Sequence, residues 1–312
     1  MNITKPTEKN LILSTQSEYF LETKKRMINR GKKPEFSLSS LPELNDKIWG
    51  IKRREITVVG ARTSQGKSLF MNQLAWDLAD QGHKVLYLSL EMDVCSLQER
   101  LFCNVMHIPN YKLLRGGFAE DKDIQSKWDS FCNLMENSFL EYSQQIGRNW
   151  NEIDTLIKNL KPVPDILILD HINEISTGNL RDRRQAVDDY LTGFRTMCVN
   201  NNISGIIGAQ INRSGQYETS KEPRMFQLKE SGKLEEYADL VMLLYWEHKD
   251  NDAKNKNAYQ IFVEKNRGGW TGKVKLRIDP EYYLLSDWTE LDEQTSKVSF
   301  SKAKHSEKDF RN

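Results

Sequence analysis

The chain has 312 residues, of which 38% are apolar and 29% are charged, and its formal net charge is +1. A chain of this size can bury a large core, whereas a net charge near zero gives no sign of a whole-molecule attraction to polyanions. The longest apolar runs, at 165–170 and 240–245, are too short to cross a bilayer. The first residues lack the apolar stretch of a signal peptide, so we expect a cytoplasmic protein without membrane contact.

The chain divides into three parts. Residues 1–35 are polar, but Phe20, Leu21, Met27 and Ile28 fit one face of a helix, which predicts a docking or linker helix. Residues 36–289 are expected to form a single domain. Residues 290–312 are rich in Lys, Ser, Glu and Asp with few apolar side chains, which predicts a flexible tail.

Short β-rich runs alternate with helical patterns over most of the central part. The runs lie at 56–59, 85–90, 166–169, 203–207 and 240–244. Such alternation predicts an α/β fold with a mostly parallel sheet flanked by helices. The next runs, at 259–264, 273–278 and 282–285, have only turn residues between them. They predict antiparallel strands at the C-terminal edge of the sheet.

A phosphate-binding pattern follows the first of these runs. Residues 61–68 fit the Walker A form in which Ala replaces the first Gly, and a helical pattern continues from them to Gly82. A strand, this loop and a helix in that order bind a triphosphate through backbone amides and the helix N-terminus. Lys67 would reach the β and γ oxygens and Ser68 would bind Mg²⁺. The predicted ATP-binding residues are Ala61, Arg62, Thr63, Ser64, Gln65, Gly66, Lys67 and Ser68.

Three polar residues follow other parallel runs and are expected at the same edge of the sheet. Asp170 ends the Walker B pattern at 165–170 and would hold Mg²⁺ together with Ser68. Glu91 would orient the attacking water or accept its proton, and Gln210 would sense the γ-phosphate. Strands also end in such residues when they cap a helix, and for Glu91 and Gln210 taken alone this alternative has about equal weight.

Six motifs occur together in a specific order and spacing. They are 60–68, 89–92 with Arg100, 168–170, 209–213, 228–232 with 235–239, and 264–272. In this combination they resemble the RecA-like C-terminal ATPase domain of the DnaB-type replicative helicases. The resemblance implies a RecA-like P-loop fold over residues 36–289, with Glu91 as the catalytic glutamate, Asp170 as the Walker B acid and Gln210 as the sensor.

The resemblance also gives roles to Lys265 and Arg267. In the family, these two cations cross to the ATP of a neighbouring subunit, where an arginine finger stabilises the charge that develops in phosphoryl transfer. Extended geometry through both residues would direct their side chains to the same face. Taken in isolation, the pair would more simply be a solvated basic hairpin.

Two segments are candidates for DNA contact. Lys229, Glu230 and Gly232 lie in a segment that resembles the family's loop facing the central channel. The basic segment 179–184, which ends at Arg184, is a second candidate, although an exposed loop without this role explains it equally well. Binding through phosphates would tolerate many sequences and depend on salt.

The function implied by the resemblance is that of an ATP- and Mg²⁺-dependent replicative DNA helicase. It would assemble as a homo-hexamer on single-stranded DNA, move 5′ to 3′ and unwind duplex, with a helicase loader and replisome proteins as partners. A recombinase or other RecA-like strand-binding ATPase, and a replication accessory that does not unwind DNA, remain alternatives.

Two departures from the family stand out. The stretch before Gly60 is shorter than the usual N-terminal collar domain, so contact with primase loses its usual platform, and the compact form suggests a phage or mobile-element replication system. His171 stands where the family usually carries an aromatic residue. We assign His171 no chemical role, because a single histidine beside a strand end is more often structural.

Overall fold

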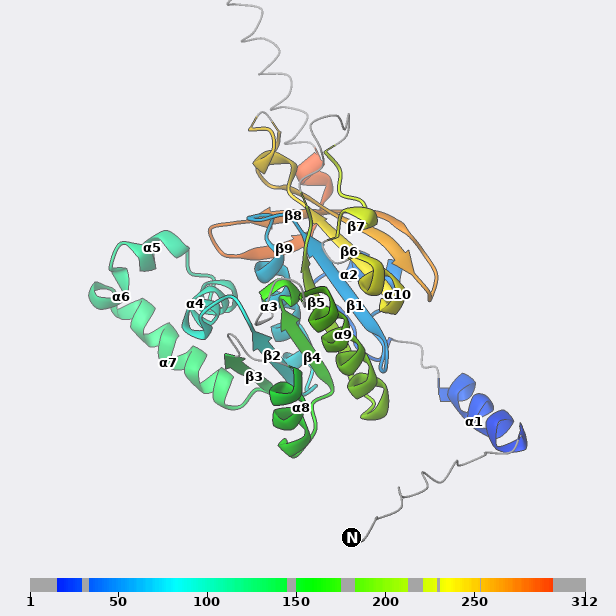
Figure 1. Cartoon of the computed structure of the whole chain (residues 1–312). Helices are drawn as coiled ribbons and strands as arrows, with labels where there is room; N and C mark the ends of the chain where they lie inside the picture. Colours follow the sequence, from blue (N-terminus) through cyan, green and yellow to red (C-terminus); the bar gives the residue numbers. More distant parts are fainter. Residues whose placement is uncertain are drawn as a thin grey trace, which may run out of the picture.

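One sheet organises the computed structural model, which describes residues 16–29, 34–144, 150–174, 183–212, 221–228, 231–252 and 254–293. The sheet has 9 strands in the order β3-β2-β4-β5-β1-β6-β7-β8-β9 (Figure 1). The parallel strands are β1 (Ile56–Ala61), β2 (Val85–Ser89), β3 (Leu140–Gln144), β4 (Ile166–Asp170), β5 (Ser204–Gln210) and β6 (Leu240–Tyr245). The antiparallel strands are β7 (Ala258–Asn266), β8 (Gly272–Asp279) and β9 (Leu284–Asp287). The predicted fold class is confirmed.

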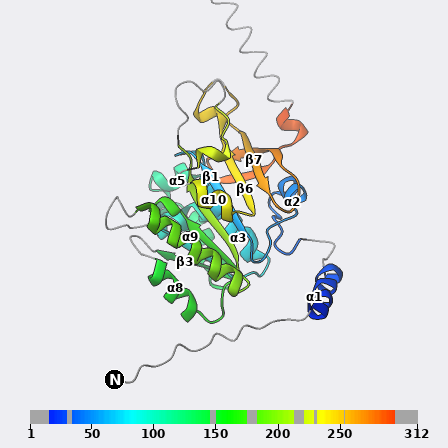
Figure 2. The same ribbon diagram turned by 45° about the vertical axis from the view of Figure 1, so that its right-hand side comes forward.

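Helices cover both faces of the sheet and give it two cores. On one face lie α2 (Pro42–Ile48), α3 (Lys67–Asp80), α4 (Val94–Val105) and α7 (Lys122–Glu136). On the other face, α9 (Arg183–Asn200) lies between α8 (Trp150–Asn159) and α10 (Ser231–Tyr237) (Figure 2). Side chains alternate along β1, so that Val59 joins the first core and Val58 the second. Burial on both faces explains why the parallel strands read as continuous apolar runs.

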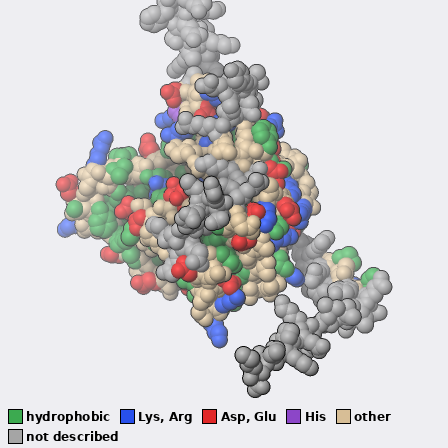
Figure 3. All heavy atoms as spheres, viewed as in Figure 1, with side chains coloured by type: hydrophobic (Ala, Val, Ile, Leu, Met, Phe, Trp, Pro, Cys, Tyr) green, Lys and Arg blue, Asp and Glu red, His purple; other side chains and the backbone are tan. Residues whose placement is uncertain are grey.

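Smaller elements complete the described part of the chain. The short helices α5 (Asn110–Leu114) and α6 (Gly117–Glu120) connect α4 to α7, and three 3-10 turns are η1 (Ile172–Glu174), η2 (Met225–Gln227) and η3 (Glu247–Lys249). In Figure 3, hydrophobic side chains gather over the α5–α7 lobe, in agreement with the exposure of Tyr111, Leu114 and Phe118. None of the helices in the described ranges is both long enough and apolar enough to cross a bilayer.

The strand β3 was missed by the sequence reasoning. Only Leu140 of its five residues is buried, and the strand lies at the edge of the sheet beside β2. An edge strand with mostly polar, partly exposed side chains lacks the apolar run that marked the other parallel strands. Its identity depends on pairing with β2, which local sequence does not encode.

The first and last described segments differ in their contacts. A helix, α1 (Gln16–Asn29), covers the predicted amphipathic stretch, and the apolar side chains of Phe20, Leu21, Met27 and Ile28 are all exposed. After β9, the side chains of Asp292 and Glu293 pair with Arg277 and Lys275 of β8. Contacts with β8 therefore continue as far as Glu293.

Replacing Gly205 by Ala tests the packing between β5 and α9. An added Cβ would lie 2.5 Å from Phe194 Cε1, 2.7 Å from Ile56 Cδ1 and 2.9 Å from Cys198 Sγ. We expect Gly205→Ala to lower the free energy of unfolding by about 1–3 kcal/mol, as overpacking does in a filled core, measured by urea denaturation. Gly232→Ala is the control, since no atom lies within 4 Å of its added Cβ, and a large loss there would contradict the packing explanation.

Candidate nucleotide-binding site

The Walker A loop connects β1 to α3 in a backbone conformation that suits phosphate binding. Ser64 and Gly66 have left-handed backbone angles, with φ of 63° and 86°. The buried hydroxyl of Tyr259 donates a 2.6 Å hydrogen bond to the carbonyl of Gln65, and a Cβ on Gly66 would lie 3.2 Å from that hydroxyl. Gly66 is also the N-cap of α3 and has no side chain to cap the helix, so its first-turn amides point toward an incoming anion.

A cleft of about 620 Å³ lies above this loop at the C-terminal edge of the parallel strands. Its size is typical of a small-molecule site. The lining includes the P-loop together with Glu91, His171, Glu174 and Gln210. The structure therefore brings the P-loop, Glu91 and Gln210 to one cleft.

Asp170 lies at the end of β4, behind Lys67 and next to His171, which line the cleft, and its side chain is 2% exposed. Its Oδ1 contacts the ammonium of Lys67, and its Oδ2 accepts a 2.8 Å hydrogen bond from the hydroxyl of Tyr87. Burial alone would raise the pKa of Asp170, but the charge of Lys67 and hydrogen bonds from Lys67, Ser68 and Tyr87 outweigh it and hold the pKa below its ordinary value. The result is an ionised carboxylate beside a serine hydroxyl. Such hard oxygen ligands are those that Mg²⁺ prefers.

Gln210, at the end of β5, contacts the P-loop directly. Its side-chain Nε2 donates a 3.0 Å hydrogen bond to Thr63 Oγ1, and its backbone N–H donates a 2.8 Å bond to Asn173 Oδ1. The next residue, Ile211, forms an isolated antiparallel β-bridge with Leu228. A short path therefore runs from the P-loop through Gln210 to the segment that the sequence associates with DNA.

Glu91 lies two residues beyond the end of β2, not at the strand end itself. Its side chain is 52% exposed, and its Oε2 is 3.2 Å from Nδ1 of His171. His171, by contrast, has a side chain only 4% exposed. The sequence reasoning gave His171 no role, yet the fold places its ring against the predicted catalytic carboxylate.

Lys265 and Arg267 lie at the opposite edge of the sheet from the cleft. Tyr259, near the start of β7, reaches the P-loop, whereas Asn266 at its end pairs with Leu240, the first residue of β6. Lys265 and Arg267 lie 6 and 8 residues beyond Tyr259, which corresponds to roughly 20 and 27 Å at about 3.4 Å per residue. No side chain bridges either distance, so neither cation can reach the P-loop of its own chain.

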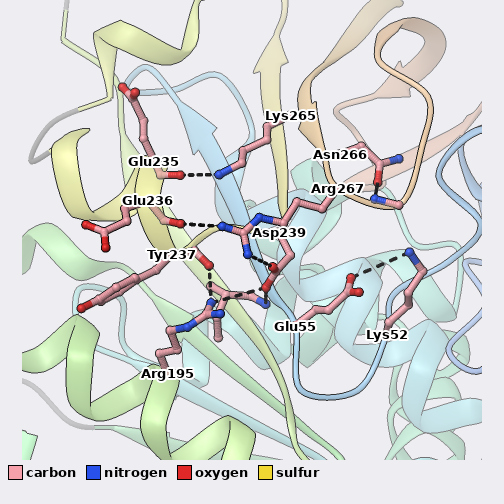
Figure 4. A network of polar contacts seen from close by, with 12 residues as sticks. Lys52, Glu55, Arg195, Glu235, Glu236, Tyr237, Asp239, Lys265, Asn266 and Arg267 are labelled. Atoms are coloured by element: carbon pink, nitrogen blue, oxygen red, sulfur yellow. Dashed lines mark hydrogen bonds and ion pairs between the residues drawn. The ribbon is translucent and has the colours of Figure 1, made fainter. Parts of the chain in front are cut away.

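Figure 4 shows how these two cations are held. The ammonium of Lys265 donates to the carbonyl of Glu235, and Arg267 donates to the carbonyl of Glu236 at 3.0 Å, both in the last turns of α10. Arg267 also pairs with Asp239 at 2.8 Å. Burial lowers the pKa of Lys265, and the positive charge of Arg267 lowers it further. Both side chains thus extend toward the same helix end.

Asp239 connects this pair to the rest of the fold. Its side chain is 8% exposed, accepts a 2.9 Å hydrogen bond from the N–H of Ile56 at the start of β1, and lies 3.5 Å from NH1 of Arg195 on α9. Its backbone carbonyl accepts a 2.8 Å bond from the N–H of Arg267. The residue that follows β7 is therefore anchored to β1 and α9 through one carboxylate (Figure 4).

The predicted DNA-contact residues are only partly visible. Gly232 lies exposed in the first turn of α10. Lys229 and Glu230 lie outside the described residues, and Arg184 lies in the first turn of α9 with its side chain outside the described part of the chain.

One wall of the cleft is formed by residues that follow the P-loop in sequence and lie next to it in space. The sequence did not identify Trp246, Lys249 and Tyr283, and it pointed to Arg100 only as part of a motif, without a role. Lys249 Nζ lies 4.7 Å from the centre of the Trp246 ring, and the Arg100 guanidinium lies 5.4 Å from that of Tyr283. All four residues line the cleft. Tyr87 and Tyr259 were missed as well, because aromatic residues inside apolar runs read as ordinary core.

The comparisons with known proteins agree with this geometry. Residues 38–287 match the family described as the DnaB-like helicase C terminal domain. The chain is 28% identical over 246 residues to the replicative DNA helicase DnaC of Bacillus subtilis, covering 77% of this chain and 54% of that protein. It is 25% identical over 233 residues to a probable plasmid replicative DNA helicase of Chlamydia psittaci, covering 73% and 50%. The chain thus spans about half the length of the curated relatives it matches.

Solved structures share the fold. A solved ATPase domain superposes with a TM-score of 0.81 at 22% identity, covering 89% of this chain and 100% of that chain. A DnaB-like replicative helicase, from a structure that also concerns its interactions with primase, superposes with a TM-score of 0.80 at 22% identity, covering 88% and 69%. With the family match extending over 38–287, the chain belongs to the DnaB-like helicase C-terminal domain family.

Proposed function

We propose that this chain binds ATP and Mg²⁺ at the P-loop, hydrolyses ATP, and drives a replicative DNA helicase that moves along single-stranded DNA as a homo-hexameric ring or spiral. The observation that supports this most is the division of the catalytic residues between two edges of the sheet. The P-loop, Glu91 and Gln210 share a cleft, whereas Lys265 and Arg267 lie 6 and 8 residues beyond Tyr259, or roughly 20 and 27 Å from it at about 3.4 Å per residue. A chain built this way needs a neighbour to complete its active site.

The chemistry proposed for the cleft is attack of water on the γ-phosphate. The triphosphate would lie on the first-turn amides of α3, and Lys67 would exchange its contact with Asp170 for β and γ oxygens. Mg²⁺, held by Ser68 and Asp170, would neutralise charge on the transferring phosphoryl group. Glu91 would orient the water and accept its proton.

The wall that faces the P-loop suits a purine base. Trp246 and Tyr283 offer flat aromatic surfaces, and the cations Lys249 and Arg100 lie against them. Base stacking on aromatic and guanidinium planes is a common mode of nucleotide recognition.

The second half of the site would come from the next subunit. Lys265 and Arg267 would leave the carbonyls of α10 and approach the neighbour's γ-phosphate, where their charge stabilises the transition state. Half of the Arg267 side chain is already exposed. The exposed apolar side chains of α1 support an assembled state, since a helix of this kind buries its face on a partner. Residues 1–35 would then act as a linker to the ATPase domain at 36–289.

DNA would be bound by Lys229, Glu230, Gly232 and Arg184 at the central channel. The protein would move along it from 5′ to 3′. The link between Ile211 and Leu228 supports a coupling of this segment to Gln210. A helicase loader and replisome proteins are the partners proposed for the assembled protein.

Mixing two inactive variants tests the shared site. Lys67→Ala removes the P-loop cation but keeps the finger, and Arg267→Ala does the reverse. Each alone should lose about 10³-fold or more in ATP turnover. In an equimolar mixture roughly a quarter of the interfaces pair an intact P-loop with an intact finger, so activity should return to about that fraction of wild type.

The matched control is Lys158→Ala, which removes an exposed cation of α8 and should leave turnover unchanged. A mixture as inactive as its two components would contradict a finger acting between subunits. Monomers at every protein, ATP and DNA concentration, seen by electron microscopy, would contradict the ring.

A salt series tests the proposed DNA contact. Lys229→Ala should weaken binding to single-stranded oligonucleotides equally for all sequences and reduce the slope of log affinity against log salt by about 0.7, the value for one phosphate contact. Fluorescence anisotropy on homopolymeric and mixed oligonucleotides measures both quantities, with Lys158→Ala again as control. An unchanged slope would remove Lys229 from the DNA interface.

A further inference from the structure

We propose that His171 is a positioning residue that holds Glu91 over the phosphate loop, and that it does so from a turn that also fixes Gln210. The proposal rests on the proposed function, because it explains how the carboxylate of Glu91 is kept in place for attack by water. The ring nitrogens of His171, and not only its volume, carry this role.

Glu91 needs an anchor because the fold leaves it loosely held. It stands beyond the end of β2, and half of its side chain is exposed. A glutamate side chain has several rotatable bonds, so without a partner it samples many positions. In the described part of the chain, His171 is the polar partner of Glu91, with Nδ1 3.2 Å from Oε2.

His171 itself is rigidly placed. Its side chain is almost fully buried, and the next residue, Ile172, is 0% exposed in the second core. Below it, β5 approaches so closely that a Cβ on Gly208 would lie 3.1 Å from His171 Cβ and 3.0 Å from Asp170 Oδ1. A buried ring therefore faces a half-exposed carboxylate, and in the proposed role the ring would hold that carboxylate in place.

The turn that follows His171 also positions Gln210, the proposed sensor. The N–H of Glu174 donates a 3.1 Å bond to the carbonyl of His171, and Glu174 Oε1 lies 3.9 Å from His171 Nε2. Within this turn, Asn173 Oδ1 accepts the backbone N–H of Gln210 at 2.8 Å. One turn thus sets the position of Glu91 on one side and of Gln210 on the other.

Three substitutions of His171 distinguish the effect of its ring nitrogens from the effect of its volume. His171→Phe keeps a ring but removes both nitrogens. His171→Asn places an amide where Nδ1 stood, and His171→Gln places one nearer to Nε2. His83→Phe is the matched control, because His83 packs edge-on against Phe36 with ring centroids 4.8 Å apart and does not line the cleft.

The measurements are the kcat and KM of DNA-stimulated ATP hydrolysis and the affinity for a fluorescent ATP analogue. We expect His171→Phe to lower kcat roughly 10- to 100-fold, as misplacement of a reacting group does, with KM and nucleotide affinity within about twofold of wild type. His171→Asn should recover most of kcat, whereas His171→Gln should not. His83→Phe should resemble wild type in all three quantities.

A double-mutant cycle with Glu91→Gln identifies the route of the effect. If His171 acts through Glu91, His171→Phe should cause no further loss of single-turnover rate in the Glu91→Gln background. Equal losses in both backgrounds, or equal kcat values for His171→Phe and His171→Asn, would overturn the proposal.

Two further outcomes are distinguishable. A wild-type rate in His171→Phe would overturn this inference alone, whereas a wild-type chain that hydrolyses no ATP would overturn the proposed function and this inference with it. Should His171→Phe fail to fold, as judged by its melting transition, the comparison of His171→Asn with His171→Gln decides between the nitrogens, and equal kcat values for these two would overturn the proposal.

Discussion

The buried carboxylate of Asp170 is the group on which the site depends. It lies at the end of β4, in the middle of the parallel strands, where burial opposes its charge. Lys67 from the P-loop and Tyr87 from β2 supply the compensating charge and hydrogen bond. Because breaking either contact would leave a buried charge short of partners, the P-loop and β2 are held around β4 before any nucleotide arrives. Because Gly208 has no side chain, β5 leaves room for this cluster.

Much of this arrangement could be predicted from the sequence. Burial on both faces produces continuous apolar runs, and parallel strands bring their ends to one edge, so the P-loop, Asp170 and Gln210 could be placed together. The same reasoning failed for β3, whose strand character comes from pairing with β2. It also failed for the residues that act through distant partners. Tyr259 looks like core until the fold places its hydroxyl on the P-loop.

The edge of the sheet away from the P-loop shows why the family resemblance was needed to give Lys265 and Arg267 a role, since the spacing of the residues did not. Nothing local distinguishes Lys265 and Arg267 from a solvated hairpin. The fold shows that both are held by carbonyls of α10, a helix that contains Gly232 of the proposed DNA segment. Asp239 then ties this helix end to the start of β1. Gly232 and the carbonyls that hold the proposed finger are therefore about one turn apart on one short helix.

The antiparallel direction of β7 has a consequence for how successive sites communicate. One end of this strand supports the P-loop through Tyr259, and the other carries the cations proposed for the adjacent subunit. The strand is hydrogen-bonded to β6 along its length and to β8 from Ala258 to Val263, which limits stretching and bending over those residues. In the proposed ring, a shift of the P-loop on nucleotide exchange would act on Tyr259 and be passed along β7 toward Lys265 and Arg267. The nucleotide state of one site would then influence the neighbouring subunit's site through the protein itself, without a signal carried by DNA.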